Sequence, residues 1–324
     1  MYQLSSEKLR NSLPGFSMEL GWEPNEVWDE YADLYNVNGL RSISRWTVGV
    51  ESYQGISLVV QHFSVVQPKG TLLLLHGYTD HLGLYSGLIE VLLKEGWNVL
   101  GVDLPGHGLS SGNSYSIQSF STYAGMLQHL LKTFCRELPV VLLGLSTGGA
   151  AILEHQRLYP AQLGDPFIVQ GRILLAPLVR PAHFEIIRWK YRFLHLFLKR
   201  VKRIRTEHSH DETFLRFIHE KDPLQAKWIA VDWIGAMLKW VPLIESAVPA
   251  LLPLTVIQGT EDTTVDWAHN VAIIKRLYPQ AQIKLVEGAR HHLVNEAEPW
   301  KGQVREQVLV ALSAVTARAA ESPL

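Results

Sequence analysis

The chain has 324 residues, one cysteine and a formal net charge of −1, and 47% of its residues are hydrophobic while 19% are charged. This composition is that of an ordinary globular protein; it excludes a disordered or fibrous chain, and the near-neutral charge gives no overall field that would attract nucleic acid. Because Cys135 has no second cysteine to pair with, an intramolecular disulfide and a thiolate metal cluster are excluded.

The N-terminal residues 1–45 are polar with scattered aromatic side chains, and we expect a short helical arm that packs on the main domain. They contain no apolar core of the length that a signal peptide needs. Apolar stretches elsewhere, such as Pro139–Leu153, are interrupted by glycine or proline and fall short of about 20 residues. A soluble, cytoplasmic protein is therefore expected.

From Trp46 to Val65 the pattern favours two β-strands around a turn at Gln54-Gly55. Beyond it, short and almost wholly apolar runs alternate with longer amphipathic stretches, which is typical of a parallel sheet covered by helices on both faces. The predicted strands are Thr71–Leu75, Val99–Val102, Val140–Leu145, Arg172–Ala176, Leu254–Ile257 and Ile283–Val286. The predicted helices between them are Tyr85–Glu95, Ser119–Arg136, Ala150–Tyr159 and Ala268–Leu277.

One interval breaks this alternation. Between Pro177 and Pro253 no strand is predicted, only helical pattern rich in tryptophan and basic residues. We therefore assign residues 46–179 and 253–324 to an α/β core and residues 180–252 to a helical cap inserted between two strands. Loops after the C-terminal ends of parallel strands are where such folds build their sites.

The sharpest motif is Gly144-Leu145-Ser146-Thr147-Gly148, which directly follows an apolar strand and directly precedes a helical run. This is the context of a nucleophile elbow, a strained strand-to-helix turn that lifts a serine hydroxyl above the sheet. Glycines allow the tight turn and the close approach of helix and strand. The sequence therefore predicts Ser146 as a catalytic nucleophile.

A serine hydroxyl needs a base and an acid that orients the base, and on this kind of sheet they follow in the order Ser, acid, His. The loop after Leu254–Ile257 contains Glu261, Asp262 and Asp266, of which Asp262 is the preferred acid.

The loop after Ile283–Val286 contains two adjacent histidines, His291 and His292. Either can serve as the base, because the spacing of strand and loop does not choose between neighbours. The oxyanion of the reaction needs two N–H donors. One is the backbone N–H of Thr147, after the nucleophile, and the other is expected from Tyr78, which follows Gly77 in the loop after the first core strand.

Other polar motifs are expected to be structural. Asp103 and His107 precede Ser146 in the chain, so they have the wrong order for a triad, and they lie in a turn dense in proline and glycine. Four further histidines have no carboxylate at ligand spacing, so no metal and no cofactor is predicted; they are His76, His81, His208 and His210.

Together these motifs resemble the monoacylglycerol lipase and lysophospholipase branch of the α/β-hydrolases, often labelled as serine aminopeptidases. The resemblance spans roughly Thr71 to Glu296 and rests on His76-Gly77, Asp80-His81, Tyr85, Asp103-x-x-Gly106-His107-Gly108-x-Ser110-x-Gly112, Gly144-x-Ser146-x-Gly148-Gly149, Asp222-Pro223-Leu224, Gly259-x-x-Asp262 and Gly288-Ala289-x-His291. It implies an α/β-hydrolase fold, a triad of Ser146, Asp262 and His291, and a lid over an acyl-binding channel. The chain departs from the family pattern at Asp80-His81, where Glu-His is usual.

The segment from Arg180 to Arg205 has nine Lys/Arg residues against one Asp/Glu, interleaved with aliphatic and aromatic side chains. Read as a basic amphipathic helix, it allows two interpretations. It could make a peripheral contact with an anionic membrane, or it could be a cap helix with one face on the core and a solvated basic face. The sequence does not indicate the oligomeric state.

The leading hypothesis is a serine carboxylic-ester hydrolase that acts on acyl esters such as monoacylglycerols or lysophospholipids through an acyl-enzyme. An aminopeptidase or amidase with the same triad is the alternative, and it would need a carboxylate in the pocket to bind a free α-amino group. Candidates for that carboxylate in the insertion are Glu185, Glu212, Glu220 and Glu245. A protein that binds ligands without turnover is disfavoured by the intact Ser, Asp and His set, and an epoxide hydrolase or dehalogenase by serine at the position where those enzymes have Asp.

Overall fold

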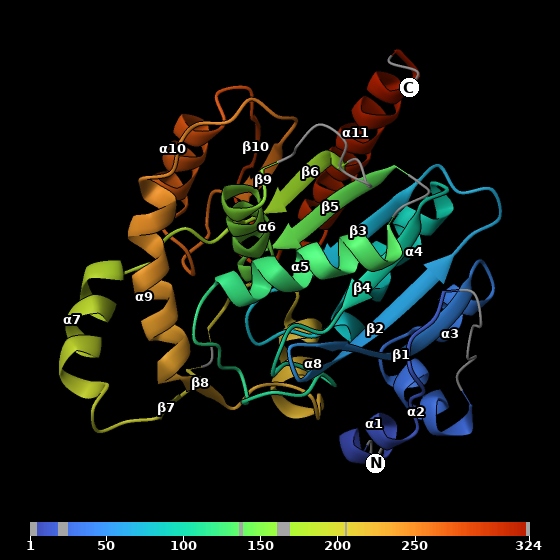
Figure 1. The fold of residues 1–324 in the computed structure, drawn as a ribbon, viewed down its shortest axis with the longest axis horizontal. Coiled ribbons are helices and arrows are strands. Elements are labelled where there is room, and N and C mark those ends of the chain that lie inside the picture. Colours follow the sequence, from blue (N-terminus) through green and yellow to red (C-terminus); the bar gives the residue numbers. More distant parts are fainter. Residues whose placement is uncertain (1–4, 19–24, 136–138, 161–168, 205, 322–324) are drawn as a thin grey trace.

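The centre of the molecule is a large sheet, seen in a computed structural model that describes residues 5–18, 25–135, 139–160, 169–204 and 206–321. Its strands are β1 (Arg45–Tyr53), β2 (Ile56–Ser64), β3 (Thr71–Leu75), β4 (Asn98–Val102), β5 (Val140–Leu145), β6 (Val169–Leu175), β9 (Thr255–Gly259) and β10 (Gln282–Val286). They lie in the order β1-β2-β4-β3-β5-β6-β9-β10 (Figure 1). Strand β2 is antiparallel to both neighbours, and the other adjacent pairs are parallel. The predicted, mostly parallel sheet is confirmed.

The predicted hairpin is confirmed as well. Tyr53 of β1 pairs with Ile56 of β2, which leaves Gln54 and Gly55 as a two-residue turn. Both turn residues have positive φ, 49° and 78°, as the tightest hairpin turns that match the twist of the strands require.

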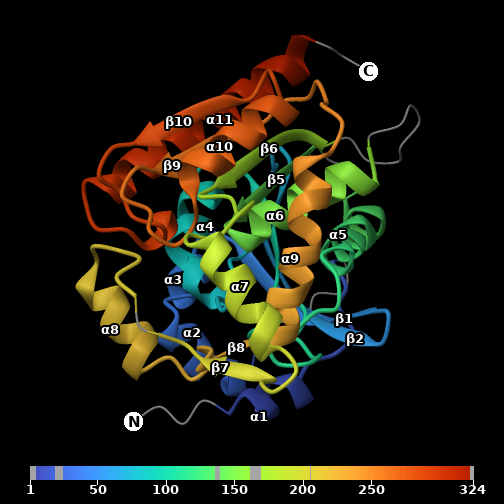
Figure 2. The same ribbon diagram turned by 90° about the vertical axis from the view of Figure 1, so that its left-hand side faces the viewer.

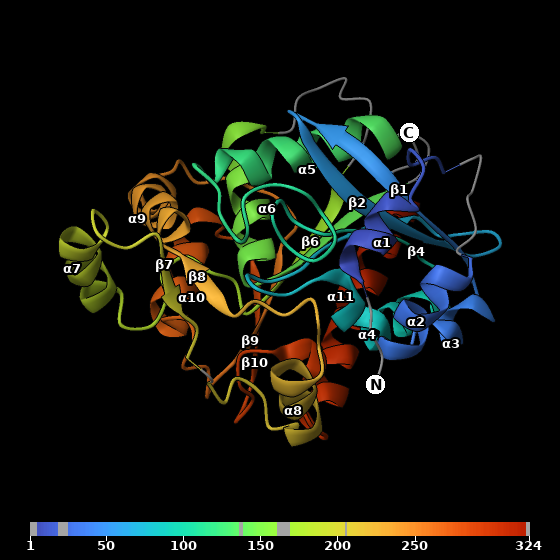
Figure 3. The ribbon, with the colours of Figure 1, turned by 90° about the horizontal axis from the view of Figure 1, so that it is seen from below.

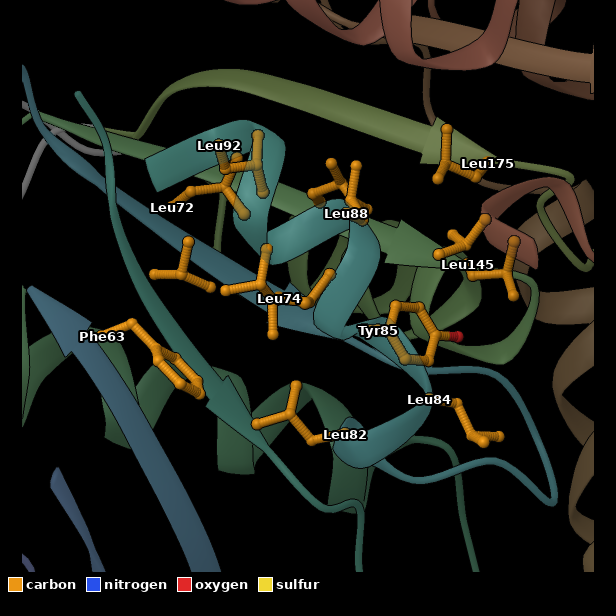
Figure 4. Packing of buried hydrophobic residues seen from close by; sticks show 14 of the residues in the cluster. Phe63, Leu72, Leu74, Leu82, Leu84, Tyr85, Leu88, Leu92, Leu145 and Leu175 are labelled. Carbon is orange, nitrogen blue, oxygen red and sulfur yellow. The ribbon is translucent and has the colours of Figure 1, made fainter. Parts of the chain in front are cut away.

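Helices cover both faces of the sheet. They are α4 (Ser86–Lys94), α5 (Ser121–Phe134), α6 (Thr147–Leu158), α10 (Trp267–Leu277) and α11 (Trp300–Glu321). Leu72 and Leu74 of β3 face the same buried cluster as Leu92 of α4 (Figure 4), whereas Leu73 faces the cluster built with α5 and α6. Every residue of β3 is buried for this reason, and all but Thr71 are leucine. Arg136, at the end of one predicted helix, lies outside the described residues.

The described parts of the N-terminal segment form three short helices, α1 (Ser6–Asn11), α2 (Glu26–Leu34) and α3 (Asn38–Arg41). Trp28 and Tyr31 of α2 pack on Trp46 of β1, with ring centroids 5.9 Å and 6.2 Å apart. The segment is therefore held to the antiparallel edge of the sheet by aromatic contacts. Residues 1–4 and 19–24 lie outside the described part.

The long insertion lies between β6 and β9, beyond the carboxyl ends of the parallel strands (Figure 1). It consists of α7 (Phe184–Leu194), β7 (Arg200–Lys202), α8 (Glu212–Glu220), β8 (Trp228–Ala230) and α9 (Val231–Glu245). Helices α7 and α9 stand on one side of it and α8 on the other (Figures 2 and 3). No helix among the described residues is long and apolar enough to cross a bilayer.

Two expectations for the insertion are wrong. Strands β7 and β8 pair antiparallel, with Arg200 opposite Ala230, although no strand is predicted between Pro177 and Pro253. A single basic helix does not reach Arg205, which itself lies outside the described residues, because α7 ends at Leu194. Three-residue strands are too short to show a period, and their pairing joins segments distant in sequence, so the basic and apolar alternation predicts a helix instead.

Candidate active site

Ser146 stands at the turn between β5 and α6 in a strained conformation, with φ of 51° and ψ of −109°. A residue with a side chain rarely adopts it. The flanking glycines allow the close backbone contacts of this turn. A Cβ on Gly144 would lie 2.4 Å from the carbonyl carbon of Gly148, and one on Gly148 would lie 2.2 Å from the carbonyl oxygen of Leu75. Helix α6 begins directly at Thr147, so the helix N-terminus lies beside the serine.

The backbone of Ser146 is fixed to the neighbouring strand. Its N–H donates to the carbonyl oxygen of Leu175 at 2.8 Å, and its own carbonyl oxygen accepts from Ala150 at 3.0 Å and from Leu178 at 3.1 Å. These bonds occupy the main chain and leave the side chain at the wall of a cavity.

Asp262 and His291 come from two adjacent parallel strands. Val286 of β10 pairs with Gly259 of β9, so the loops that follow both strands emerge side by side. His291 Nδ1 donates to Asp262 Oδ2 at 2.7 Å. Asp262 is held in turn by the N–H groups of Thr264 and Val265 and by the side chain of Gln258, at 2.8, 3.1 and 3.1 Å.

The other candidates in these two loops have different partners. Asp266 accepts the N-terminal hydrogen bond of α10, and the Glu261 side chain is mostly exposed. His292 Nε2 donates to Asp80 Oδ2 at 3.2 Å rather than to Asp262. The structure therefore brings His291, of the two adjacent histidines, to the acid that the sequence favours.

The pair of Asp262 and His291 is buried, and each partner shifts the other. Burial alone would lower the pKa of His291, but the charge and hydrogen bond of Asp262 raise it above its ordinary value. Burial alone would raise the pKa of Asp262, and His291 with two backbone N–H groups lowers it. The carboxylate therefore stays ionised and stabilises a protonated imidazole, as a general base in acyl transfer requires.

The loop after β3 lies against Ser146. A Cβ on Gly77 would be 3.6 Å from the Cβ of Ser146. The Gly77 N–H already donates to the hydroxyl of Tyr85 at 3.1 Å. Among the described residues, the N–H groups of Tyr78 and Thr147 donate to no acceptor, so they remain available to an oxyanion.

Tyr78 is held rigidly by its ring. It stacks on Trp233 of α9 with centroids 3.9 Å apart. Its hydroxyl donates to the carbonyl oxygen of Tyr115 at 2.8 Å and accepts from the N–H of Ala230 at 3.2 Å. The insertion thus fixes the loop that carries the predicted oxyanion donor, a contact that the sequence did not reveal.

Ser146, His291 and Tyr78 all line one cavity of about 650 Å³. Much of its wall is apolar and comes from the insertion, including Ile187 and Leu194 of α7, Val201, Ile229, and Ile234 and Met237 of α9. Such a pocket favours long apolar groups over polar ones.

The motif around Asp103 is structural, as predicted. Asp103 accepts hydrogen bonds from the N–H groups of Leu82 and Leu109, both at 2.8 Å, and so ties two loops together. His76 Nε2 accepts from Leu104, and burial lowers its pKa to about 3, so it stays neutral. Among the described residues no group of three His, Cys, Asp or Glu side chains is arranged to hold a metal ion.

Asp222 has a role that the sequence did not predict. Its Oδ1 accepts from the Tyr35 hydroxyl at 2.7 Å and from the N–H of Leu224 at 3.0 Å, and its Oδ2 accepts from His81 Nε2 at 3.0 Å. One buried carboxylate thereby joins the N-terminal segment, the insertion and the loop after β3. In the sequence, Asp222 stands out only as part of the Asp222-Pro223-Leu224 motif of the family resemblance. Its contact with Tyr35 leaves no local pattern, because the two residues lie far apart in the chain.

Comparison with known proteins gives a family match over most of the chain. The model of the family described as "Serine aminopeptidase, S33" matches residues 66–298. The human monoglyceride lipase is 27% identical over 266 residues, covering 78% of this chain and 85% of that protein. Phospholipase YtpA of Bacillus subtilis (strain 168) is 27% identical over 267 residues, covering 77% and 96%.

Solved structures share the fold. A soluble variant of monoglyceride lipase from Saccharomyces cerevisiae superposes with a TM-score of 0.70 at 17% identity, covering 82% of this chain and 94% of that one. The Paleococcus ferrophilus monoacylglycerol lipase superposes with a TM-score of 0.68 at 20% identity, covering 79% and 98%. The predicted α/β-hydrolase fold is confirmed.

Proposed function

Because the chain belongs to the serine aminopeptidase S33 family of α/β-hydrolases, we propose that it hydrolyses acyl esters of lipids with Ser146 as nucleophile, His291 as base and Asp262 as orienting acid. The observation that carries this proposal is the 2.7 Å bond between His291 and Asp262 at the wall of the cavity that Ser146 also lines. Similarity to lipases and a phospholipase supports the same reaction class.

In the proposed reaction, Ser146 attacks the ester carbonyl while His291 takes its proton. The carbonyl oxygen becomes an oxyanion that the N–H groups of Tyr78 and Thr147 stabilise, each donor contributing about 3–4 kcal/mol to the transition state. His291 then gives the proton to the leaving alcohol, and the acyl chain stays on Ser146. Water activated by His291 releases the fatty acid and restores the serine.

The apolar wall supports an acyl chain as the group that fills the cavity, with monoacylglycerols and lysophospholipids as the model substrates. An aminopeptidase would need a free carboxylate there. Among the described lining residues the carboxylate is Asp80, which His292 already engages. The four glutamates of the insertion considered above do not line the cavity. An ester is therefore favoured over an aminoacyl substrate.

The test is a set of initial rates on p-nitrophenyl esters from acetyl to palmitoyl, beside a monoacylglycerol and aminoacyl p-nitroanilides, with Ser146→Ala as the blank. Ester hydrolysis with a chain-length optimum, absent from the blank, is expected. Hydrolysis confined to the anilides would move the protein to the peptidases. Stoichiometric acylation of Ser146 without turnover would support a binding protein instead, whereas labelling by a fluorophosphonate with no hydrolysis of any of these substrates would indicate a competent triad whose substrate is not among them. The cytoplasmic location stays a prediction from the sequence.

We also propose that the cap contacts membranes. Trp189 and Phe193 of α7 are exposed by 64% and 54%, and Phe197 in the following loop by 80%. Exposed lysine and arginine side chains alternate with them on α7. A solvated basic face alone does not account for exposed aromatic rings of this size, whereas insertion into an anionic bilayer does.

Sedimentation with phosphatidylcholine vesicles, with and without phosphatidylglycerol, tests this contact. Binding is expected to rise with the anionic lipid and to be lost in Trp189→Asp with Phe197→Asp. The matched control is Val248→Asp, since Val248 is 86% exposed outside α7 and its loop. Equal losses in both variants would refute a specific contact.

A further inference from the structure

Positive charge gathers at the cavity. Of the described side chains that line it, Lys190, Lys202 and Arg203 are Lys or Arg, and Asp80 is the carboxylate. Asp80 is already engaged, because His292 Nε2 donates to it at 3.2 Å. Burial alone would raise the pKa of Asp80, but His292 lowers it well below its usual range. The walls therefore do not balance the positive charge of the three basic side chains.

Arg203 is the least exposed of these three basic side chains. Lys190 and Lys202 are exposed, whereas Arg203 is half-buried. Its Nη1 atom is buried and bonds to none of the described residues. Burial lowers the pKa of Arg203, an effect that the carboxylates of Asp80 and Asp222 offset only in part. A buried guanidinium nitrogen without an acceptor is costly, so a bound molecule that supplies an acceptor there would be stabilised.

The charge of Arg203 acts at the end of the cavity where the polar groups are. Arg203 directly follows β7, and the N–H of Ala230, at the end of its partner strand β8, donates to the Tyr78 hydroxyl at 3.2 Å on the loop beside Ser146. The charge of Arg203 also acts on His208, whose pKa burial lowers to about 3, with His292 and Arg203 acting in the same direction. Helices α7 and α9, in contrast, line the cavity with apolar side chains such as Ile187, Leu194 and Met237. Arg203 therefore faces the part of a bound ester near the reacting carbonyl rather than the end of its acyl chain.

We propose that Arg203 binds a phosphate group on the alcohol part of the ester, so that the preferred substrates are acylated glycerol phosphates rather than neutral monoacylglycerols. The inference rests on the proposed function and narrows it. A guanidinium presents paired N–H donors in a plane that match two phosphate oxygens, and it keeps its charge when partly buried. Exposed Lys190 and Lys202 add positive charge at the same cavity and attract the anion before it binds.

The first experiment uses binding alone. Glycerol 3-phosphate and glycerol are compared as competitive inhibitors of p-nitrophenyl butyrate hydrolysis in the unmodified protein, in Arg203→Gln and in Arg203→Lys. Glycerol 3-phosphate is expected to inhibit far better than glycerol, with Ki about tenfold or more higher in Arg203→Gln and an intermediate value in Arg203→Lys. Inorganic phosphate in a third arm distinguishes a glycerol phosphate site from one for the free anion, and stronger inhibition by inorganic phosphate than by glycerol 3-phosphate would overturn the proposal.

The second experiment uses turnover of 1-butyrylglycerol and its 3-phosphate, which are short enough to stay in solution. The ratio of kcat/KM for the phosphorylated over the neutral ester is expected to exceed one and to fall about tenfold or more in Arg203→Gln. Arg216→Gln is the matched control, because Arg216 is an exposed arginine of α8 that does not line the cavity.

The alternatives give different results. If Arg203 only balances the charge of Asp80, both substrates lose activity alike and the ratio does not change, which overturns the proposal. An equal fall in Arg216→Gln would assign the preference to surface charge and overturn it too. Hydrolysis of neither ester, together with no activity on any p-nitrophenyl ester from acetyl to palmitoyl, would refute the proposed function, whereas the binding experiment can be repeated by calorimetry with glycerol 3-phosphate to judge Arg203 separately.

Discussion

Asp222→Asn should destabilise the protein by an amount that depends on pH. The carboxylate and its partner His81 both have fully buried side chains, and Asp222 accepts three hydrogen bonds of 2.7 to 3.0 Å. Removing one member of a buried ion pair costs about 3–5 kcal/mol. Asparagine keeps an acceptor for Tyr35 and Leu224, so we expect a smaller loss of about 2–3 kcal/mol in the free energy of unfolding.

The pH dependence follows from the direction of both shifts. Burial alone would lower the pKa of His81, but Asp222 raises it, so this part of the stability is complete below about pH 6.5 and is lost as pH rises through the folded value. Burial alone would raise the pKa of Asp222, but His81 lowers it, so its part is complete above about pH 4 and is lost as pH falls through the folded value. The free energy of unfolding of the unmodified protein therefore exceeds that of Asp222→Asn by the largest amount between about pH 4 and 6.5.

Urea unfolding at pH 6 and pH 9 measures this difference. Asp29→Asn is the control, because it removes the same charge from an exposed ion pair with Arg41 and should cost less than about 1 kcal/mol at either pH. A loss of stability in Asp222→Asn that is equal at pH 6 and pH 9, or no larger than that of the control, would refute the reasoning.

Three further predictions concern the proposed active site. His291→Ala should lower kcat on p-nitrophenyl butyrate by up to about 10⁶-fold, while His292→Ala should retain most of it; the reverse result would assign the base to His292. The raised pKa of His291 means that kcat/KM falls as pH drops through a value above 6.5, because the protonated ring cannot take the proton of Ser146. In Asp262→Asn this limb should move to lower pH, since burial is then opposed only by the charge of Asp80, and the rate should fall by about 10⁴-fold; an unmoved limb would contradict the assignment. Gly148→Ala should cost about 4 kcal/mol or more in urea unfolding, because its Cβ would lie 2.2 Å from a backbone oxygen that cannot move aside, and normal stability would show that the turn relaxes.

The sheet and its proposed site were predictable from the sequence because local sequence patterns determine both. Continuous apolar runs such as Thr71–Leu75 require cover on both faces, and the observed strands differ from the predicted ones by three residues or fewer at either end. The strand, serine and helix in succession predict the turn at Ser146. The choice of His291 over His292 needed the family resemblance, because adjacent residues in a loop have no period.

The insertion was predictable in its place between two strands and in its helical content, but not in its strands or its contacts. Its strands pair residues such as Lys202 and Trp228, which are far apart in sequence and form a ladder too short to leave a pattern. The bond from Tyr35 to Asp222 spans 187 positions, and no local signal connects the two. Contacts of this kind depend on side-chain packing that is particular to this chain.

In the proposed mechanism, this contrast assigns the proton transfer to the sheet and the substrate preference to the insertion. The partners Asp262 and His291 follow strands whose backbones are hydrogen-bonded in register, so the sheet itself brings them within reach of each other. Arg203 instead follows β7, whose position depends on β8 and on the contacts of the insertion with the core. A change in the insertion can therefore alter which alcohol group is accepted without moving the pair that transfers the proton. If Arg203 sets the preference for phosphate, Arg203→Gln must change the ratio of kcat/KM for the phosphorylated ester over the neutral ester. The pH at which kcat/KM falls, which reports the pKa of His291, must stay the same.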